Sequence, residues 1–124
     1  MLVEGLIYTS RTEVTLDNCA VSVGSGDLEV FATPAMIALM ENAAMNAVAE
    51  VLPEGSTTVG SEMNATHIKP TGIGGNVAAT ATLKSVEGRK LTFEVVASDD
   101  NGIIGEGVHV RYVVDREKFM SKLR

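Results

Sequence analysis

The sequence has very little of the chemistry that cross-links a protein. Cys19 is the single cysteine among 124 residues, so an intrachain disulfide and a multi-thiolate metal site are both excluded. A cysteine without a partner is more often a small buried apolar residue than a nucleophile, and we interpret Cys19 in that way. Tryptophan is absent, and there are only three phenylalanines and two tyrosines. The core must therefore be built from Val, Ile, Leu, Ala and Met.

Long apolar runs are missing as well. No stretch approaches the roughly 18 apolar residues that a membrane-spanning helix needs, so we expect no membrane partner. The first residues, MLVEGLIYTSRTEV, carry an acidic residue early and have no long apolar centre, which argues against a signal peptide. We therefore expect a cytoplasmic protein.

Positive charge is in short supply. Ten basic residues against sixteen acidic ones give a net charge of −6. Non-specific nucleic-acid binding depends on neutralising phosphates with Lys and Arg, so we expect no nucleic-acid partner. A few local cations would still suffice for one anionic small molecule. The composition, 45% hydrophobic and 21% charged, is typical of a globular protein, and the length fits one domain over residues 1–124.

The clearest helix signal follows Thr33. Threonine is a common N-cap residue and Pro34 suits the first helical position. The sequence therefore predicts a helix that begins at Pro34 and continues through residues 35–51, which contain no Gly or Pro, before Pro53 and Gly55 end it. Apolar residues at helical spacing form a stripe that we expect to face the core, namely Ile37, Met40, Ala44, Ala47 and Val48.

Elsewhere, a period of two, clearest around residues 77–84 and 91–97, and a segment rich in Thr and Val at residues 10–16 predict strands. These cover residues 10–16, 57–69, 76–86, 90–98 and 103–114. Residues 20–31 are predicted to form a loop, and residues 116–123 a short final helix. Short connections between the last three strands predict hairpins, whereas the glycine-rich stretch 69–75 is long enough for a crossover between strands that are not neighbours.

One strand, a long helix and a mainly antiparallel run of four strands describe an α+β layer architecture. A helix of about 17 residues is roughly 25 Å long, enough to lie across a curled sheet. Such a sheet leaves its edge strands open, and open edges usually need covering. We therefore expect a homodimer formed through an edge, and we leave open whether dimers pair into a tetramer.

Few residues could carry chemistry. Glu41 borders the apolar stripe, either as a glutamate reaching solvent or as a partly desolvated carboxylate suited to base or nucleophile work. His67 and His109 each lie in a predicted strand, where a lone histidine is more often structural, and the pattern does not rank them. Thr33 already has a structural explanation as a helix cap. There is no Gly-x-Ser-x-Gly elbow, phosphate loop or His-x-x-x-His metal pair.

Several of these residues fall into a familiar pattern. The run from Phe31 to Ala44, followed by Thr58-Val59-Gly60 and Thr66-His67, resembles the fluoroacetyl-CoA thioesterase-like branch of the hotdog family. The resemblance covers essentially the whole chain. It implies a hotdog fold, in which a curled antiparallel sheet wraps around one long central helix. It also implies hydrolysis of a small acyl-CoA thioester, with no cofactor beyond the CoA of the substrate and no metal.

The resemblance assigns roles to five residues. It implies that Thr33, Glu41 and His67 form the active site, with Glu41 in a crevice facing His67, and it thereby favours His67 over His109. Glu41 would be general base or nucleophile, Thr33 would orient the thioester and His67 would assist. Gly60 and Arg111 would contact substrate, although Gly60 could also relieve crowding or form a bulge and Arg111 could be a surface residue.

One feature departs from the family pattern. The specialised fluoroacetyl enzyme covers its site with aromatic residues from the segment before the helix, whereas Ser22–Val30 contains none. The acyl group therefore stays open. An enoyl-CoA hydratase and a non-catalytic acyl-CoA-binding module are the alternatives that a thiol-release assay would separate from a thioesterase.

Overall fold

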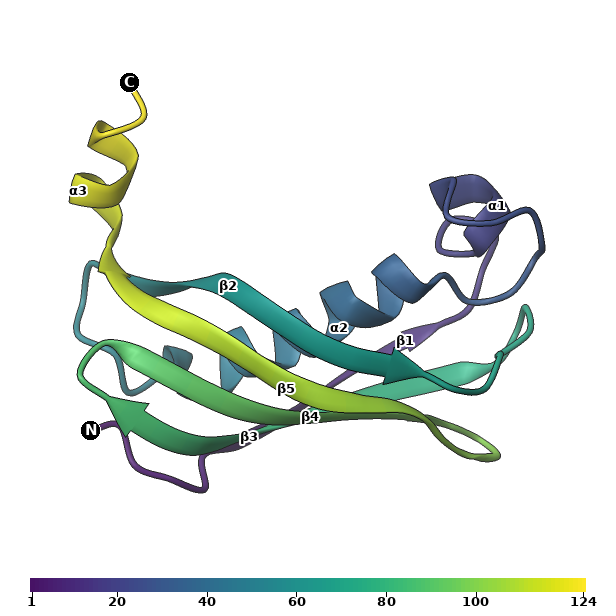
Figure 1. Cartoon of the computed structure of the whole chain (residues 1–124), viewed down its shortest axis with the longest axis horizontal. Helices are drawn as coiled ribbons and strands as arrows, with labels where there is room; N and C mark the ends of the chain where they lie inside the picture. The colour runs from purple at the N-terminus through teal and green to yellow at the C-terminus, as the bar shows by residue number, and fades with distance from the viewer.

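A five-stranded antiparallel sheet curls around one long helix in the computed structural model, which describes all 124 residues (Figure 1). The strands are β1 (Ile7–Glu13), β2 (Ser56–His67), β3 (Asn76–Glu87), β4 (Lys90–Asp99) and β5 (Gly102–Asp115). The helices are α1 (Ala20–Val23), α2 (Thr33–Ala49) and α3 (Arg116–Ser121). The predicted α+β architecture is therefore confirmed. No helix combines the length and the apolar character that crossing a membrane would require.

The strand order is β1-β3-β4-β5-β2, so β1 and β2 form the two edges. The last three strands follow one another as hairpins, and the chain between β2 and β3 crosses to the far side of the sheet, as the length of residues 69–75 predicts. Four strands lie within two residues of their predicted bounds. The first was wrong by three residues, because the chain leaves the β1–β3 ladder after Glu13 and Val14 instead hydrogen-bonds the turn at Gly74 and Gly75.

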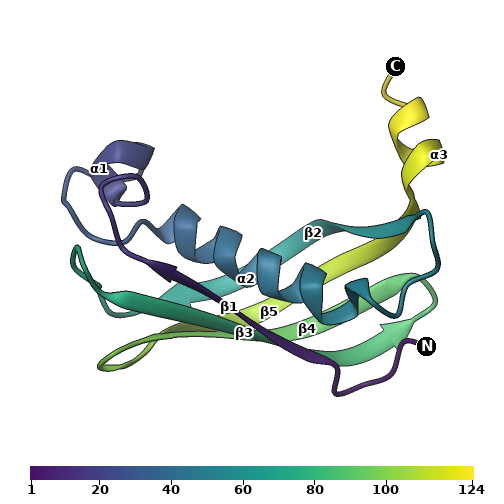
Figure 2. The same cartoon turned by 180° about the vertical axis from the view of Figure 1, so that it is seen from behind.

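The core lies between α2 and the concave face of the sheet (Figure 2). Alternate residues of β3 and β4 are fully buried against the helix, which confirms the predicted alternation. Those residues are Val77, Ala79, Ala81, Leu83, Leu91, Phe93, Val95 and Ala97. The helix stripe is rotated from the predicted one. Met36 and Ala43 are buried with Met40, Ala44 and Val48, while Ile37 and Ala47 are only partly buried.

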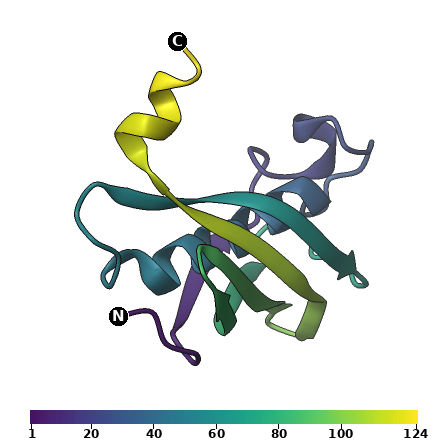
Figure 3. The ribbon, with the colours of Figure 1, turned by 60° about the vertical axis from the view of Figure 1, so that its left-hand side comes forward.

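Two further expectations were wrong in detail. Residues 20–31 are not all loop, because α1 forms one turn there and bridges tie Cys19 to Phe31 and Val30 to Gly72. Cys19 is fully buried, as expected. The final helix, predicted to reach residue 123, ends at Ser121. This helix, α3, is capped by the side chain of Asp115 and projects beyond the sheet (Figure 3).

Candidate active site

Thr33 and His67 meet at one end of α2. Thr33 is the first residue of the helix and His67 is the last residue of β2. The N-cap position belongs to Ala32, so the prediction that Thr33 caps the helix was wrong. The Thr33 hydroxyl instead forms a 2.8 Å hydrogen bond with Nδ1 of His67. The hydroxyl therefore bonds the imidazole rather than a backbone N–H of α2, and this bond fixes the orientation of the ring.

The second ring nitrogen of His67 has no partner. Nε2 is buried and forms no hydrogen bond within the chain. Burial lowers the pKa of His67 below its usual value, so the ring is neutral at physiological pH. The ring borders a pocket of about 280 Å³, which we call the histidine pocket, together with Thr33, Phe31, Lys69 and Ser25. A buried nitrogen without a partner beside a pocket calls for an explanation, and a functional role is one.

Glu41 lies in a different pocket, further along α2. This carboxylate pocket holds about 420 Å³ and is lined by Glu41, Thr58, Gly60 and Arg111, among others. A Cβ atom on Gly60 would lie 2.8 Å from Oε2 of Glu41, so the absence of a side chain there lets the carboxylate approach the strand. Gly60 also precedes a bulge in the β2–β5 pairing. Both structural readings of this glycine are thus confirmed.

Arg111 and His109 form the floor beneath Glu41. Arg111 is buried, with 8% of its side chain exposed, so the alternative that it is a surface residue was wrong. Its Nη1 lies 4.0 Å from Oε2 of Glu41, whose side chain is 42% exposed. His109 is fully buried beside it, with Nε2 3.1 Å from Nη1 of Arg111. The sequence pattern did not single out His109 in this way, although the alternation His109-x-Arg111 places both on one strand face.

Within one chain, Glu41 does not face His67. The two side chains border separate pockets, and Gly60 and His67 lie seven residues apart on β2, or roughly 23 Å at 3.3 Å per residue. The residues of the predicted site therefore lie in two separate groups. Thr33 and His67 form one, and Glu41, Gly60 and Arg111 form the other.

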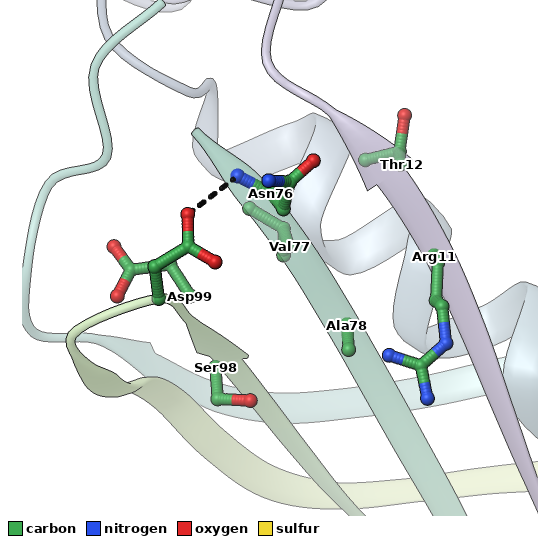
Figure 4. A pocket seen from close by; sticks show the side chains of 8 residues that line it. Arg11, Thr12, Asn76, Val77, Ala78, Ser98 and Asp99 are labelled. Atoms are coloured by element: carbon green, nitrogen blue, oxygen red, sulfur yellow. Dashed lines mark hydrogen bonds between the residues drawn. The ribbon is translucent and has the colours of Figure 1, made fainter. Parts of the chain in front are cut away.

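A further hollow lies away from α2. It holds about 480 Å³ and is lined by residues of β1, β3, the end of β4 and the turn after it, including Arg11, Asp99 and Asp100 (Figure 4). The backbone N–H of Asn76 donates to Oδ2 of Asp100 at 3.4 Å there. No imidazole reaches this hollow, and its carboxylates already accept hydrogen bonds from Asn76, Thr71 and Asn101. The two pockets on α2 carry the more reactive groups.

Comparison with known proteins identifies the family. The profile of the family described as fluoroacetyl-CoA-specific thioesterase matches residues 14–117. The fluoroacetyl-CoA thioesterase of Streptantibioticus cattleyicolor is 45% identical over 96 residues, which cover 77% of this chain and 69% of that protein.

Solved structures give the same result at the level of the fold. A variant of the fluoroacetyl-CoA-specific thioesterase FlK superposes with a TM-score of 0.93 at 35% identity, covering 100% of this chain and 96% of that one. A thioesterase-superfamily protein of Thermus thermophilus superposes with a TM-score of 0.92 at 26% identity, covering 100% and 92%. These matches confirm the predicted hotdog fold.

Proposed function

Because the chain belongs to the fluoroacetyl-CoA-specific thioesterase family and is therefore a thioester hydrolase, we propose that it cleaves a small acyl-CoA into a free acid and CoA. One observation carries the proposed chemistry. The carboxylate of Glu41 lies in a pocket, held beside the backbone of Gly60, and makes no hydrogen bond within the chain. Its lone pairs are free to take a proton or to attack a carbonyl carbon.

Glu41 is the group that starts the reaction. It either removes a proton from water, which then attacks the thioester carbonyl, or attacks that carbon itself. Direct attack expels the thiolate and gives a mixed anhydride, which water then hydrolyses to regenerate the carboxylate. General acid–base steps of this kind contribute about 10²–10⁴ in rate.

Thr33 and His67 act on the other side of the thioester. The hydroxyl of Thr33 orients the acyl group, and the neutral ring of His67 holds the reacting atoms through its unpartnered Nε2, while the thiolate leaves as the anion or takes the proton that Glu41 removed from water. The N-terminal end of α2 carries partial positive charge from the helix dipole, which stabilises a developing oxyanion. The scheme needs no metal or further cofactor, because CoA enters as part of the substrate.

A homodimer would reunite the two parts of the site. β2 pairs with β5 on one side and is open on the other, over twelve residues. Antiparallel pairing of this edge with a second copy, about a two-fold axis between Met63 and Asn64, would set Gly60 opposite the partner subunit's His67. Glu41 of one chain would then face the imidazole of the other.

Complementation tests this arrangement. Glu41→Gln and His67→Ala are each expected to be inactive, but a heterodimer of the two would hold one intact shared site. Random mixing should recover about a quarter of the wild-type activity, since half of the dimers are mixed and each has one good site of two. If Glu41 and His67 act within one chain, mixing recovers nothing. Sedimentation would report the dimer, or a tetramer, directly.

The central experiment is thiol release from a panel of short acyl-CoAs by wild type and Glu41→Gln. Acetyl-CoA belongs in the panel because a FlK variant has been crystallised with it. We expect Glu41→Gln to lose about 10²–10⁴ of turnover with its fold intact. Glu50→Gln, at the exposed end of the same helix, is the matched control. Full activity of Glu41→Gln would remove Glu41 from the mechanism, and an enoyl absorbance change without thiol release would indicate a hydratase.

A further inference from the structure

Arg111 is held by its neighbours on three sides. Its Nε donates to the hydroxyl of Thr58 at 2.8 Å, and its Nη2 donates to the carbonyl of Thr58 at 3.0 Å. Its Nη1 donates to Nε2 of His109 at 3.1 Å. A buried guanidinium held by several fixed acceptors has one orientation rather than many. Nη1 is the only one of the three nitrogens that also lies close to Glu41.

His109 accepts this bond only in one protonation state. Its Nδ1 lies 2.7 Å from the carbonyl oxygen of Glu62, which can only accept, so Nδ1 carries the proton. Nε2 is then bare and accepts from Arg111. Burial and the neighbouring Arg111 charge lower the pKa of His109, which keeps the ring neutral, while the Glu62 carbonyl and the Glu41 charge oppose this. The Glu62 carbonyl stands just past the β2 bulge, so the bulge and the imidazole are linked.

The bond from Arg111 to His109 competes with a bond from Arg111 to Glu41. Charged pairs in hydrogen-bond contact lie at about 2.7–2.9 Å. Nη1 stands 4.0 Å from Oε2 of Glu41, so it attracts the carboxylate without touching it. Without an acceptor at His109, Nη1 would gain most by closing onto Glu41 and occupying the lone pairs that the reaction needs.

We infer that His109 is a positioning residue, which holds the Arg111 guanidinium away from Glu41 and so keeps the carboxylate free for the reaction. The inference rests on the proposed role of Glu41. It assigns His109 no contact with substrate. It also explains why a second histidine lies buried in this site, where a residue of purely apolar character would pack as well.

A double-mutant cycle tests the coupling. His109→Phe keeps a ring of similar size, and the ring would still pack near Phe93, whose centroid lies 6.4 Å from that of His109. We expect kcat to fall about ten- to hundredfold, from the strength of a hydrogen bond to a charged group. In an Arg111→Gln background the same change should alter kcat less than about twofold, because no guanidinium remains to move.

The outcomes separate cleanly. An equal loss of kcat with and without Arg111 would show that His109 acts independently of the guanidinium. An effect on KM alone would assign His109 to substrate binding. Either result overturns the inference. Val110→Ala, a buried neighbour on β5, controls for general destabilisation and should keep its kcat. The proposed function fails by a different result, which is full turnover of Glu41→Gln.

Nitrogen-15 NMR of the wild-type ring provides a second measurement should His109→Phe not fold. At neutral pH we expect a protonated Nδ1 and a bare Nε2 on His109. A ring protonated at Nε2, or at both nitrogens, could not accept from Arg111 and would refute the inference without any variant.

Discussion

Replacing Gly60 by alanine would place a methyl group inside the carboxylate pocket. The new Cβ would lie 2.8 Å from Oε2 of Glu41, 3.2 Å from Cε1 of His109 and 3.4 Å from Nη1 of Arg111. Oε2 must then retreat by roughly 0.7 Å to reach ordinary van der Waals separation. The glutamate can do so, because it is the end of a flexible and partly exposed side chain. The imidazole is buried and fixed at both nitrogens, so it yields much less.

Catalysis should suffer more than folding. Misplacing a reacting group by about 1 Å costs on the order of 10²-fold in rate, so we expect Gly60→Ala to lose about 10- to 100-fold in kcat/KM. Overpacking of this size costs about 1–3 kcal/mol of stability, which leaves the fold intact at room temperature. Gly60 does not adopt a positive φ, so alanine adds no backbone strain.

The assay is release of free thiol from short acyl-CoAs, with circular dichroism and urea unfolding on the same samples. Gly72→Ala is the matched control, because a Cβ there meets nothing within 4 Å and the residue has no positive φ. It should retain full activity. Should Gly60→Ala fold normally and turn over substrate as fast as the Gly72 variant, the position of the Glu41 carboxylate could not matter to the reaction.

Three further predictions follow from single contacts. Thr33→Val removes the hydroxyl bonded to His67 and should lower kcat about tenfold or more, while the melting temperature stays unchanged because Thr33 does not cap α2. Thr12→Val on β1 is the control. A fall in melting temperature without a loss of kcat would instead show that Thr33 caps the helix. Burial lowers the pKa values of His67 and His109, so the unfolded chain binds protons before the folded chain as the pH falls. The free energy of unfolding should be highest above about pH 6.5 and should decline as the pH falls through the pKa values of the folded state. The urea midpoint between pH 8 and pH 5 measures this, and a flat profile would contradict it. Gly107→Ala would drive a methyl group into the backbone of Asn64 and Ala65 across the β2–β5 pair and should cost about 3 kcal/mol or more in urea unfolding. A stability equal to wild type would mean that β2 and β5 do not pack this closely at Gly107.

The fold could be predicted because its signals are local. Alternation along Val77–Leu83 and Leu91–Ala97 depends only on which face of a strand is buried, and the strands form as expected. The helix was also evident from an uninterrupted run between Pro34 and Pro53. Its starting residue was less certain. Thr33 fits an N-cap by type, but a hydroxyl that can bond an imidazole from another element need not turn to its own helix.

The site was only partly predictable, because its contacts are distant in sequence. Residue types alone left His67 and His109 unranked, and the resemblance to a family favoured His67. The burial of His109 depends on a bulge in a neighbouring strand and on an arginine two residues away, and neither is a local sequence signal. Arg111 is a similar case. A basic residue in a strand is usually exposed, and the hydrogen bonds from Arg111 to Thr58 and His109 offset the desolvation cost of burying its charge.

The separation of Glu41 from His67 follows from how α2 crosses the sheet. The helix passes from the end of β2 at His67 toward its middle at Gly60, so residues eight apart on the helix meet different parts of one strand. Each part then lacks what the other has, since the histidine pocket has a buried nitrogen without a partner and the carboxylate pocket has an acid without a hydrogen bond. When an antiparallel strand pairs with its own copy, each end of the strand lies beside the opposite end of the partner strand. This is the simplest arrangement that would bring each carboxylate pocket to a histidine pocket. A chain that hydrolyses thioesters as a strict monomer would therefore need Glu41 and His67 to work on the substrate from separate pockets.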